Sequence, residues 1–244
     1  MQRRDLFALV GLSAVCALAD AQGGGDIAAS RKAIYDQIRG WASDPANSDY
    51  LRSLLPEGKG TEILDIDDDR VKFAADFIAR IPRGLKPMEV ALHMLRDLPE
   101  DYRMEWPRDT PGVKKPANPM IIGFFAATRT EPFQGDQTAW CAAFMCWTLA
   151  LTNVKHPSSA GSKSFRSFGA STKDPARGDI VVYKSTDDPI RGHVGFFDGY
   201  AAQDKSAIYI VGGNQRDALT RAKWGLKQGA LKLDSFRTVD GIRV

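Results

Sequence analysis

The sequence predicts an α+β protein in which a helical N-terminal region precedes a buried helix packed on an antiparallel sheet. Apolar residues recur at helical spacing through the first half of the chain. A nearly all-apolar stretch from Thr138 to about Leu149 is typical of a buried helix. From Asp179 onward, β-branched and aromatic runs alternate with turn residues, which indicates strands. Helices followed by strands favour the α+β class.

The composition is that of an ordinary soluble protein long enough to bury a large core. The chain has 244 residues, 43% of them hydrophobic and 26% charged, with a net charge of +3. Its lysines and arginines form no dense run of the kind that nucleic-acid-binding proteins carry. We therefore expect no nucleic-acid partner.

Residues 1–21 have the pattern of an export signal peptide. Arg3 and Arg4 precede an apolar stretch at 6–18, and Ala19-Asp20-Ala21 fits a cleavage site. The paired arginines resemble a twin-arginine signal, although Sec export stays open. The apolar stretch is too short to span a bilayer, so we expect an exported protein, periplasmic or extracellular, without a stable membrane anchor.

Removal of this signal would remove Cys16 and leave two cysteines, Cys141 and Cys146. Five residues apart on a helix, their side chains point about 140° apart, since each residue turns about 100°. That geometry excludes an easy disulfide between them. We therefore interpret Cys146 as a small buried apolar residue.

Residues 27–107 form the predicted helical region, in three stretches. An acidic run at 67–69 opens the second stretch, and Pro87 takes the first position of the third. The apolar positions are Ile34, Ile38 and Trp41 in the first, Val71, Ala74, Phe77, Ile78 and Ile81 in the second, and Met88, Ala91, Leu92, Leu95 and Leu98 in the third.

Four acidic residues in this region lie at the offsets of a calcium-binding loop: Asp65, Asp67, Asp69 and Asp76. Arg70, however, occupies the position at which such a loop needs glycine for its sharp turn. Acidic residues also complement the dipole at a helix N-terminus, and this is the interpretation we adopt. No pair of histidines or cysteines has metal-ligand spacing, so we expect no metal and no cofactor.

A proline-rich stretch at 108–118 predicts a linker, which makes 119–244 the second domain. Asn118 can cap a helix that begins at Pro119 and continues to about Thr128. A polar loop then leads to the apolar helix. The predicted strands follow at 179–183, 193–197 and 207–211.

The apolar helix carries the candidate nucleophile. With Thr138 as its N-cap, Cys141 lies in the first turn, where unpaired N–H groups and the helix dipole favour a thiolate. His193 begins a predicted strand that could bring its imidazole to the sulfur as the base. His156 is a weaker alternative, in the loop after the helix.

The remaining candidates support this pair. Asn214, after a glycine pair, can accept from the far N–H of the imidazole and orient it, with Asp198 as the second choice. The backbone N–H of Cys141 is the expected oxyanion donor, together with Gln137. The candidate substrate contacts are Trp140 and Gly192.

Four segments in this order resemble the CHAP-type amidohydrolases of the bacterial papain-like superfamily: TAWCAAF (138–144), PARGDIVV (175–182), GHVGF (192–196) and VGGNQ (211–215). The resemblance implies a papain-like core that cleaves peptidoglycan, as an amidase or a crosslink endopeptidase. It makes Cys141 the nucleophile, His193 the base and Asn214 the third group. Many such proteins have a glutamate two residues before that asparagine, where this chain has Gly212.

The sequence thus predicts an exported cysteine hydrolase with peptidoglycan or its stem peptides as partner, and an activator or inhibitor protein remains open. One alternative is a papain-like hydrolase of another peptide or amide. Another is a silent module that only binds wall peptides, although both Cys141 and His193 are retained.

Overall fold

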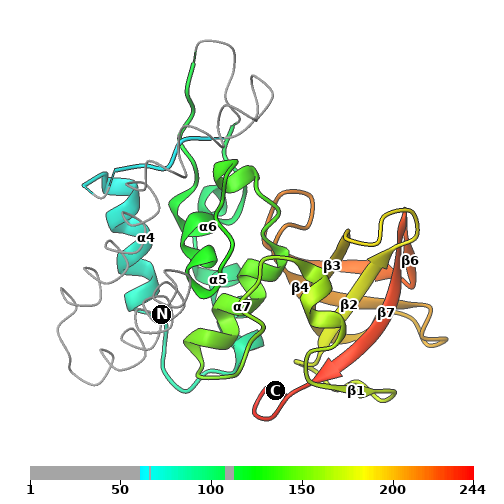
Figure 1. Ribbon diagram of the computed structural model, residues 1–244. Coiled ribbons are helices and arrows are strands. Elements are labelled where there is room, and N and C mark those ends of the chain that lie inside the picture. The colour runs from blue at the N-terminus through cyan, green and yellow to red at the C-terminus, as the bar shows by residue number, and fades with distance from the viewer. Residues whose placement is uncertain (1–60, 66, 108–112) are drawn as a thin grey trace, which may run out of the picture.

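The computed structural model describes residues 61–65, 67–107 and 113–244. The predicted signal peptide at 1–21, the first helical stretch at 34–41 and residues 108–112 of the predicted linker lie outside these residues. Within them the protein is α+β, as predicted, with helices gathered on one side of a mainly antiparallel sheet (Figure 1).

The two α-helices described in the N-terminal region, within residues 67–107, begin where the sequence predicts. Helix α4 (Asp69–Ala79) is capped by Asp68, whose carboxylate accepts from the backbone N–H of Arg70 at 2.9 Å. Helix α5 (Pro87–Asp97) begins at its proline. The acidic run therefore acts as a helix start. The short 3-10 helix η1 (Glu100–Arg103) follows.

Helices α6 and α7 form the centre of the molecule. Asn118 caps α6 (Pro119–Phe124), accepting from the N–H of Met120 at 2.9 Å, and the 3-10 helix η2 (Phe125–Ala127) extends it. Every residue of α7 (Cys141–Leu151) is buried. Two further 3-10 helices are η3 (Gly135–Gln137) and η4 (Ser162–Arg166).

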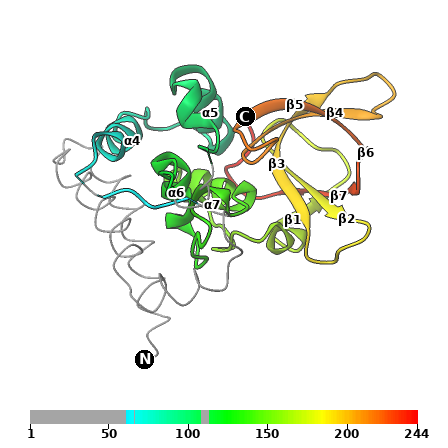
Figure 2. The ribbon, with the colours of Figure 1, turned by 90° about the horizontal axis from the view of Figure 1, so that it is seen from above.

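Within the described residues, seven strands form one sheet, six of them in the order β1-β7-β2-β3-β4-β5, and every pairing is antiparallel. Because β6 pairs with β7, the sheet curls round on itself (Figure 2). The three predicted strands are confirmed as β2, β3 and β4, and the others were not predicted. The bounds are β1 Ala170–Thr172, β2 Ile180–Ser185, β3 Gly192–Tyr200, β4 Ala207–Gly212, β5 Thr220–Gly225, β6 Lys227–Gln228 and β7 Leu231–Thr238.

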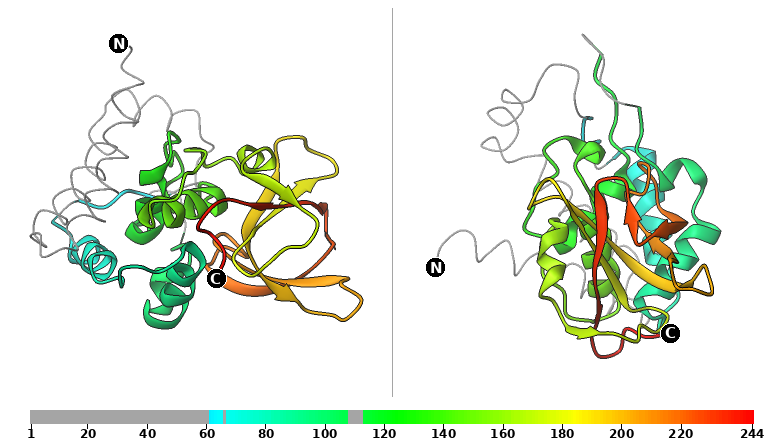
Figure 3. Two further views of the ribbon diagram at one scale, coloured as in Figure 1. Left: turned by 90° about the horizontal axis from the view of Figure 1, so that it is seen from below. Right: turned by 90° about the vertical axis from the view of Figure 1, so that its right-hand side faces the viewer.

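The two faces of the curled sheet serve different cores. Val194 and Phe196 of β3 join the helix-side core with α7, whereas Phe197 lies in a second cluster with Tyr183 and Ile208 inside the curl. This alternation is the period-2 pattern of a strand buried on both faces. Figure 3 shows α4 to α7 together on one side of the strands.

The helical N-terminal region shares its core with the rest of the protein. Buried residues of α4 and α5, such as Val71 and Met94, belong to the same cluster as Phe144 of α7 and Val182 of β2. The predicted linker at 108–118 therefore does not separate two hydrophobic cores among the described residues.

The buried carboxylate of Asp136 joins this region to the loop before α7. One carboxylate oxygen accepts from the backbone N–H groups of Trp106 and Asn118, each at 2.8 Å. The other oxygen accepts from the hydroxyl of Thr61 at 2.5 Å. Three segments that are distant in sequence thus depend on one charged group for their hydrogen bonds.

We expect Asp136→Ala to lower the free energy of unfolding by about 2–5 kcal/mol, because it leaves buried donors of Trp106 and Asn118 without an acceptor. Urea denaturation followed by tryptophan fluorescence measures the change. The exposed Asp240→Ala is the control and should change stability by less than about 0.5 kcal/mol. Equal stability of the two variants would contradict this role of Asp136.

Candidate active site

Cys141 is the first residue of α7, as the sequence predicts. The predicted cap differs: Trp140 occupies the N-cap position without a side-chain hydrogen bond. The hydroxyl of Thr138 instead accepts from the backbone N–H of Gln134 at 2.9 Å. The helix start nevertheless leaves N–H groups of its first turn without intrahelical acceptors, next to the thiol.

The thiol of Cys141 is held in its protonated form by burial. Its residue is 6% exposed, and burial raises the pKa of the thiol to about 11. The backbone N–H groups of Val194, Ala142 and Cys141 itself lower this pKa, but by less. The sequence predicts an activated thiolate, whereas the structure favours a neutral thiol because desolvation outweighs the helix terminus.

His193 lies near the start of β3, paired with Tyr183 of β2. Since Val194 and Phe196 face the helices, the alternation of the strand turns the imidazole toward the inside of the curl. There it stacks on Trp224, with ring centroids 4.6 Å apart and planes 17° apart. The residue is 4% exposed, and burial lowers the pKa of the imidazole to about 4.

Cys141 and His193 are neighbours through the backbone of β3. The N–H of Val194, which belongs to the peptide bond that follows His193, acts on the Cys141 sulfur. No hydrogen bond links sulfur and imidazole within the described ranges, and Nε2 of His193 is buried without a partner. The two residues are therefore adjacent along the backbone and both neutral, but the thiol lies on the helix side of β3 and the imidazole lies inside the curl.

Asn214 follows β4 in a left-handed backbone conformation, with φ of 58°. Its Nδ2 donates to Oε1 of Glu105 at 3.1 Å. Nε1 of Trp140 donates to the same oxygen, also at 3.1 Å. The carboxylate of Glu105, from the helical region, thus links Asn214 to Trp140, the residue before the nucleophile. In the described part of the chain, Asn214 forms no hydrogen bond with His193.

The other three candidates have packing or hydrogen-bonding roles here. Gln137 directs its amide group to the carbonyl of Trp106 at 3.1 Å and to Asp136 at 3.2 Å. Trp140 is completely buried, so its side chain packs in the core instead of lining an open groove. Gly192 is needed for close approach, since a Cβ there would lie 2.4 Å from the carbonyl oxygen of Tyr183.

Cys141, His193 and Asn214 lie within a segment that matches one family model. Residues 133–214 match the family model of the CHAP domain. The resemblance carried by the four motifs is confirmed. CHAP domains are generally hydrolytic, as amidases or peptidases. A comparison with curated proteins and another with solved structures found no significant match.

The two alternative candidates, His156 and Asp198, interact with other residues. Nδ1 of His156 accepts from the backbone N–H of Ser158 at 3.3 Å, in the loop that follows α7. The carboxylate of Asp198 bridges Arg177 and Arg221. Cys141 and Cys146 are both free thiols, and burial raises the pKa of Cys146 to about 12.

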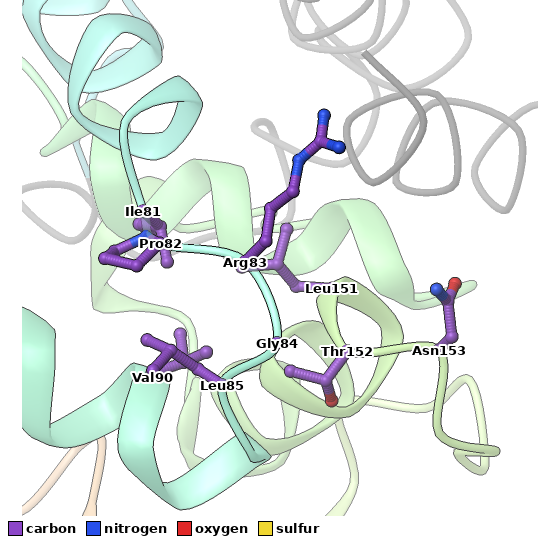
Figure 4. Close-up of a pocket in the computed structure, with 9 residues that line it drawn as sticks. All are labelled: Ile81, Pro82, Arg83, Gly84, Leu85, Val90, Leu151, Thr152 and Asn153. Carbon is purple, nitrogen blue, oxygen red and sulfur yellow. The ribbon is translucent and has the colours of Figure 1, made fainter. Parts of the chain in front are cut away.

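A pocket of about 250 Å³ lies at the far end of α7 from the CHAP cysteine (Figure 4). It is formed by the connection between α4 and α5 and by the end of α7. Its lining residues are Ile81, Pro82, Arg83, Gly84, Leu85, Val90, Leu151, Thr152 and Asn153. An 11-residue helix spans about 16 Å, so this pocket is separate from the site at Cys141.

Two residues of the site were not predicted from the sequence. Trp224 covers the ring of His193, but it lies in β5, a strand that was not predicted and that follows the CHAP segment. Glu105 comes from the helical region, where no motif surrounds it.

Within the described residues, no helix is long and apolar enough to cross a membrane.

We expect acidification to destabilise the protein through His193. The pKa falls from 6.5 in the unfolded chain to about 4 in the folded protein, so folded His193 resists protonation. The contribution of neutral His193 to the free energy of unfolding is fully present above pH 6.5. It falls by about 3 kcal/mol as the pH is lowered toward 4. Urea unfolding between pH 4 and 7 measures this slope, which His193→Gln should reduce and His156→Gln should reduce less. An unchanged slope in His193→Gln would contradict burial of a neutral imidazole.

We expect Cys141 to be alkylated slowly at neutral pH, because its pKa is raised to about 11. In a chain with Cys16→Ser and Cys146→Ala, the rate with iodoacetamide should rise about tenfold for each pH unit from 7 to 10. Mass spectrometry follows the modification, and a further Cys141→Ala variant gives the background. A plateau between pH 5 and 7 would instead show the thiolate that the sequence predicts.

Proposed function

We propose that this protein is an exported cysteine hydrolase that cleaves amide bonds in peptidoglycan, with Cys141 as nucleophile and His193 as base. The observation that carries the proposal is the position of Cys141: it opens a buried helix beside the peptide of His193, inside a segment that matches the CHAP domain. Covalent catalysis requires the base in contact with the nucleophile. The proposal therefore includes a turn of the His193 ring from Trp224 to the helix side of β3, where the sulfur lies. In this proposal the helix and the curled sheet correspond to the two halves of a papain-like core.

The raised pKa of the thiol and the lowered pKa of the imidazole favour a general-base mechanism. Neutral His193 accepts the thiol proton as the sulfur of Cys141 bonds to the amide carbon. The backbone N–H of Cys141, which has no intrahelical acceptor at the start of α7, donates a hydrogen bond to the oxyanion. The C–N bond then breaks, and the protonated imidazole gives its proton to the leaving amine.

Deacylation uses the same groups in reverse. His193 takes a proton from water while the water oxygen attacks the thioester carbon. The C–S bond breaks, the sulfur regains the proton, and a carboxylic acid leaves. Asn214 is proposed to orient the imidazole by accepting its far N–H.

Peptidoglycan is the favoured substrate class for two reasons. CHAP domains generally act on substrates of this type. The signal-peptide pattern at 1–21 would send the chain to the compartment that holds the wall, and a net charge of +3 favours association with an anionic polymer. A non-wall peptide or amide is the second candidate substrate.

Digestion of purified sacculi tests the proposal. Wild-type protein should release muropeptide fragments, and Cys141→Ala should lower the rate at least about a thousandfold, because the covalent step loses its nucleophile. Mass spectrometry of the fragments separates an amidase, which cuts between sugar and stem peptide, from an endopeptidase.

Cys146→Ala is the matched control, since this cysteine lies one turn further along the same helix and is also buried. It should keep activity within about threefold and cost some stability through the cavity that it leaves. Release that is equal in wild type and Cys141→Ala would refute the mechanism. No release by a folded wild-type protein would refute the wall substrate and favour the other candidates.

A further inference from the structure

A segment from outside the CHAP match is built into the site. Residues 103–106, here called the bridging segment, pair with the loop that follows Asn214. The N–H of Glu105 donates to the carbonyl of Asp217 at 2.8 Å, and the N–H of Leu219 donates to the carbonyl of Arg103 at 2.7 Å. An isolated β-bridge joins Met104 to Ala218 between these bonds. The segment therefore pairs in an extended conformation with the loop beside the candidate orienting residue.

The other end of the bridging segment is attached to the loop before Cys141. The N–H of Trp106 donates to Asp136 at 2.8 Å, and Gln137 donates to the carbonyl of Trp106 at 3.1 Å. The segment thus spans from the loop that leads to the nucleophile to the loop that carries Asn214. These bonds use backbone groups of the segment, so they do not by themselves require glutamate at 105.

The side chain of Glu105 adds two contacts of a different kind. One carboxylate oxygen, Oε1, accepts from Nε1 of Trp140 and from Nδ2 of Asn214, each at 3.1 Å. Trp140 is the residue before the nucleophile, and its ring packs against Gly213, where a Cβ would lie 2.3 Å from the ring. One oxygen therefore ties both loops of the site together.

The chemistry of these groups determines which way the Asn214 amide faces. A carboxylate accepts hydrogen bonds and does not donate, so only the NH₂ end of the amide can face Glu105. The oxygen of Asn214 is then left as the acceptor for another donor. Without a carboxylate at this point, either end of the amide could face the bridging segment.

We propose that Glu105 is a positioning residue for the hydrolytic centre, which holds the amide of Asn214 with its oxygen available to the imidazole of His193 when the ring leaves Trp224. This rests on the proposed function, since it takes His193 and Asn214 as parts of one site. Glu105 does not touch the reacting atoms; it acts through Asn214 and Trp140.

Three variants of Glu105 separate positioning from mere support of the fold. Glu105→Gln keeps an acceptor oxygen, and Trp140 Nε1, which can only donate, orients that oxygen toward the site. Glu105→Met keeps the length of the side chain without an oxygen, and Glu105→Ala removes both. Asp179→Asn and Asp179→Ala are the matched controls, because this buried carboxylate accepts from Arg243 and from the N–H of Ala176, away from Asn214.

The first readout is the rate of fragment release from purified sacculi at saturating protein. Glu105→Met and Glu105→Ala should lower the rate ten- to a hundredfold, whereas Glu105→Gln should stay within about threefold of wild type. The second readout is the ¹⁵N shifts of the His193 imidazole, which report its tautomer without any substrate. They should move in Glu105→Met as they move in Asn214→Ala, and not in either Asp179 variant.

Wild-type rates and unchanged His193 shifts in Glu105→Met would overturn the proposal. Loss of activity in Glu105→Gln as large as in Glu105→Met would also overturn it, because a retained acceptor would then be insufficient. If wild-type protein releases nothing from sacculi, the proposed function fails on its own account. The ¹⁵N shifts of the same variants then decide the role of Glu105 alone.

Discussion

The buried carboxylate of Asp136 is the interaction on which the arrangement of the site depends. A charge removed from water costs several kcal/mol unless donors replace the lost hydration. Here the donors come from Thr61, Trp106 and Asn118, in three segments that meet at the loop before Cys141. Satisfying one carboxylate therefore places the helical region, the start of α6 and the bridging segment against the nucleophile helix.

Desolvation shifts the pKa values of the two reactive groups in opposite directions, and each shift favours the uncharged form of its group. Burial raises the pKa of Cys141 and lowers that of His193, which leaves a thiol beside an uncharged imidazole. An ion pair formed in advance would place two charges where water is excluded, with Trp224 covering the ring. In the proposed mechanism charge separates only as the bond to the substrate forms, so the groups around the oxyanion bear more of the stabilisation.

The helices and the central strands could be predicted because their signals are local. Asp68, Pro87 and Asn118 mark helix starts by their own hydrogen-bonding and backbone chemistry, and these were confirmed. The last strands were missed because their polar and charged residues are only partly buried, which weakens the alternation. Glu105 could not be found from the sequence, because its partners are brought to it by tertiary packing alone. The neutrality of Cys141 was missed for a related reason: the helix-terminus effect is visible in the sequence, and the depth of burial is not.

The shared core and the bridging segment have an implication for how such a protein can evolve. The CHAP segment at 133–214 lacks Glu105, Asn118 and the donors that satisfy its own Asp136. Recombination that moved this segment alone into another gene would leave a buried carboxylate without its donors and an amide without its acceptor. The smallest piece of the chain that keeps these contacts is therefore longer than the segment that matches the family, because it includes the end of the helical region.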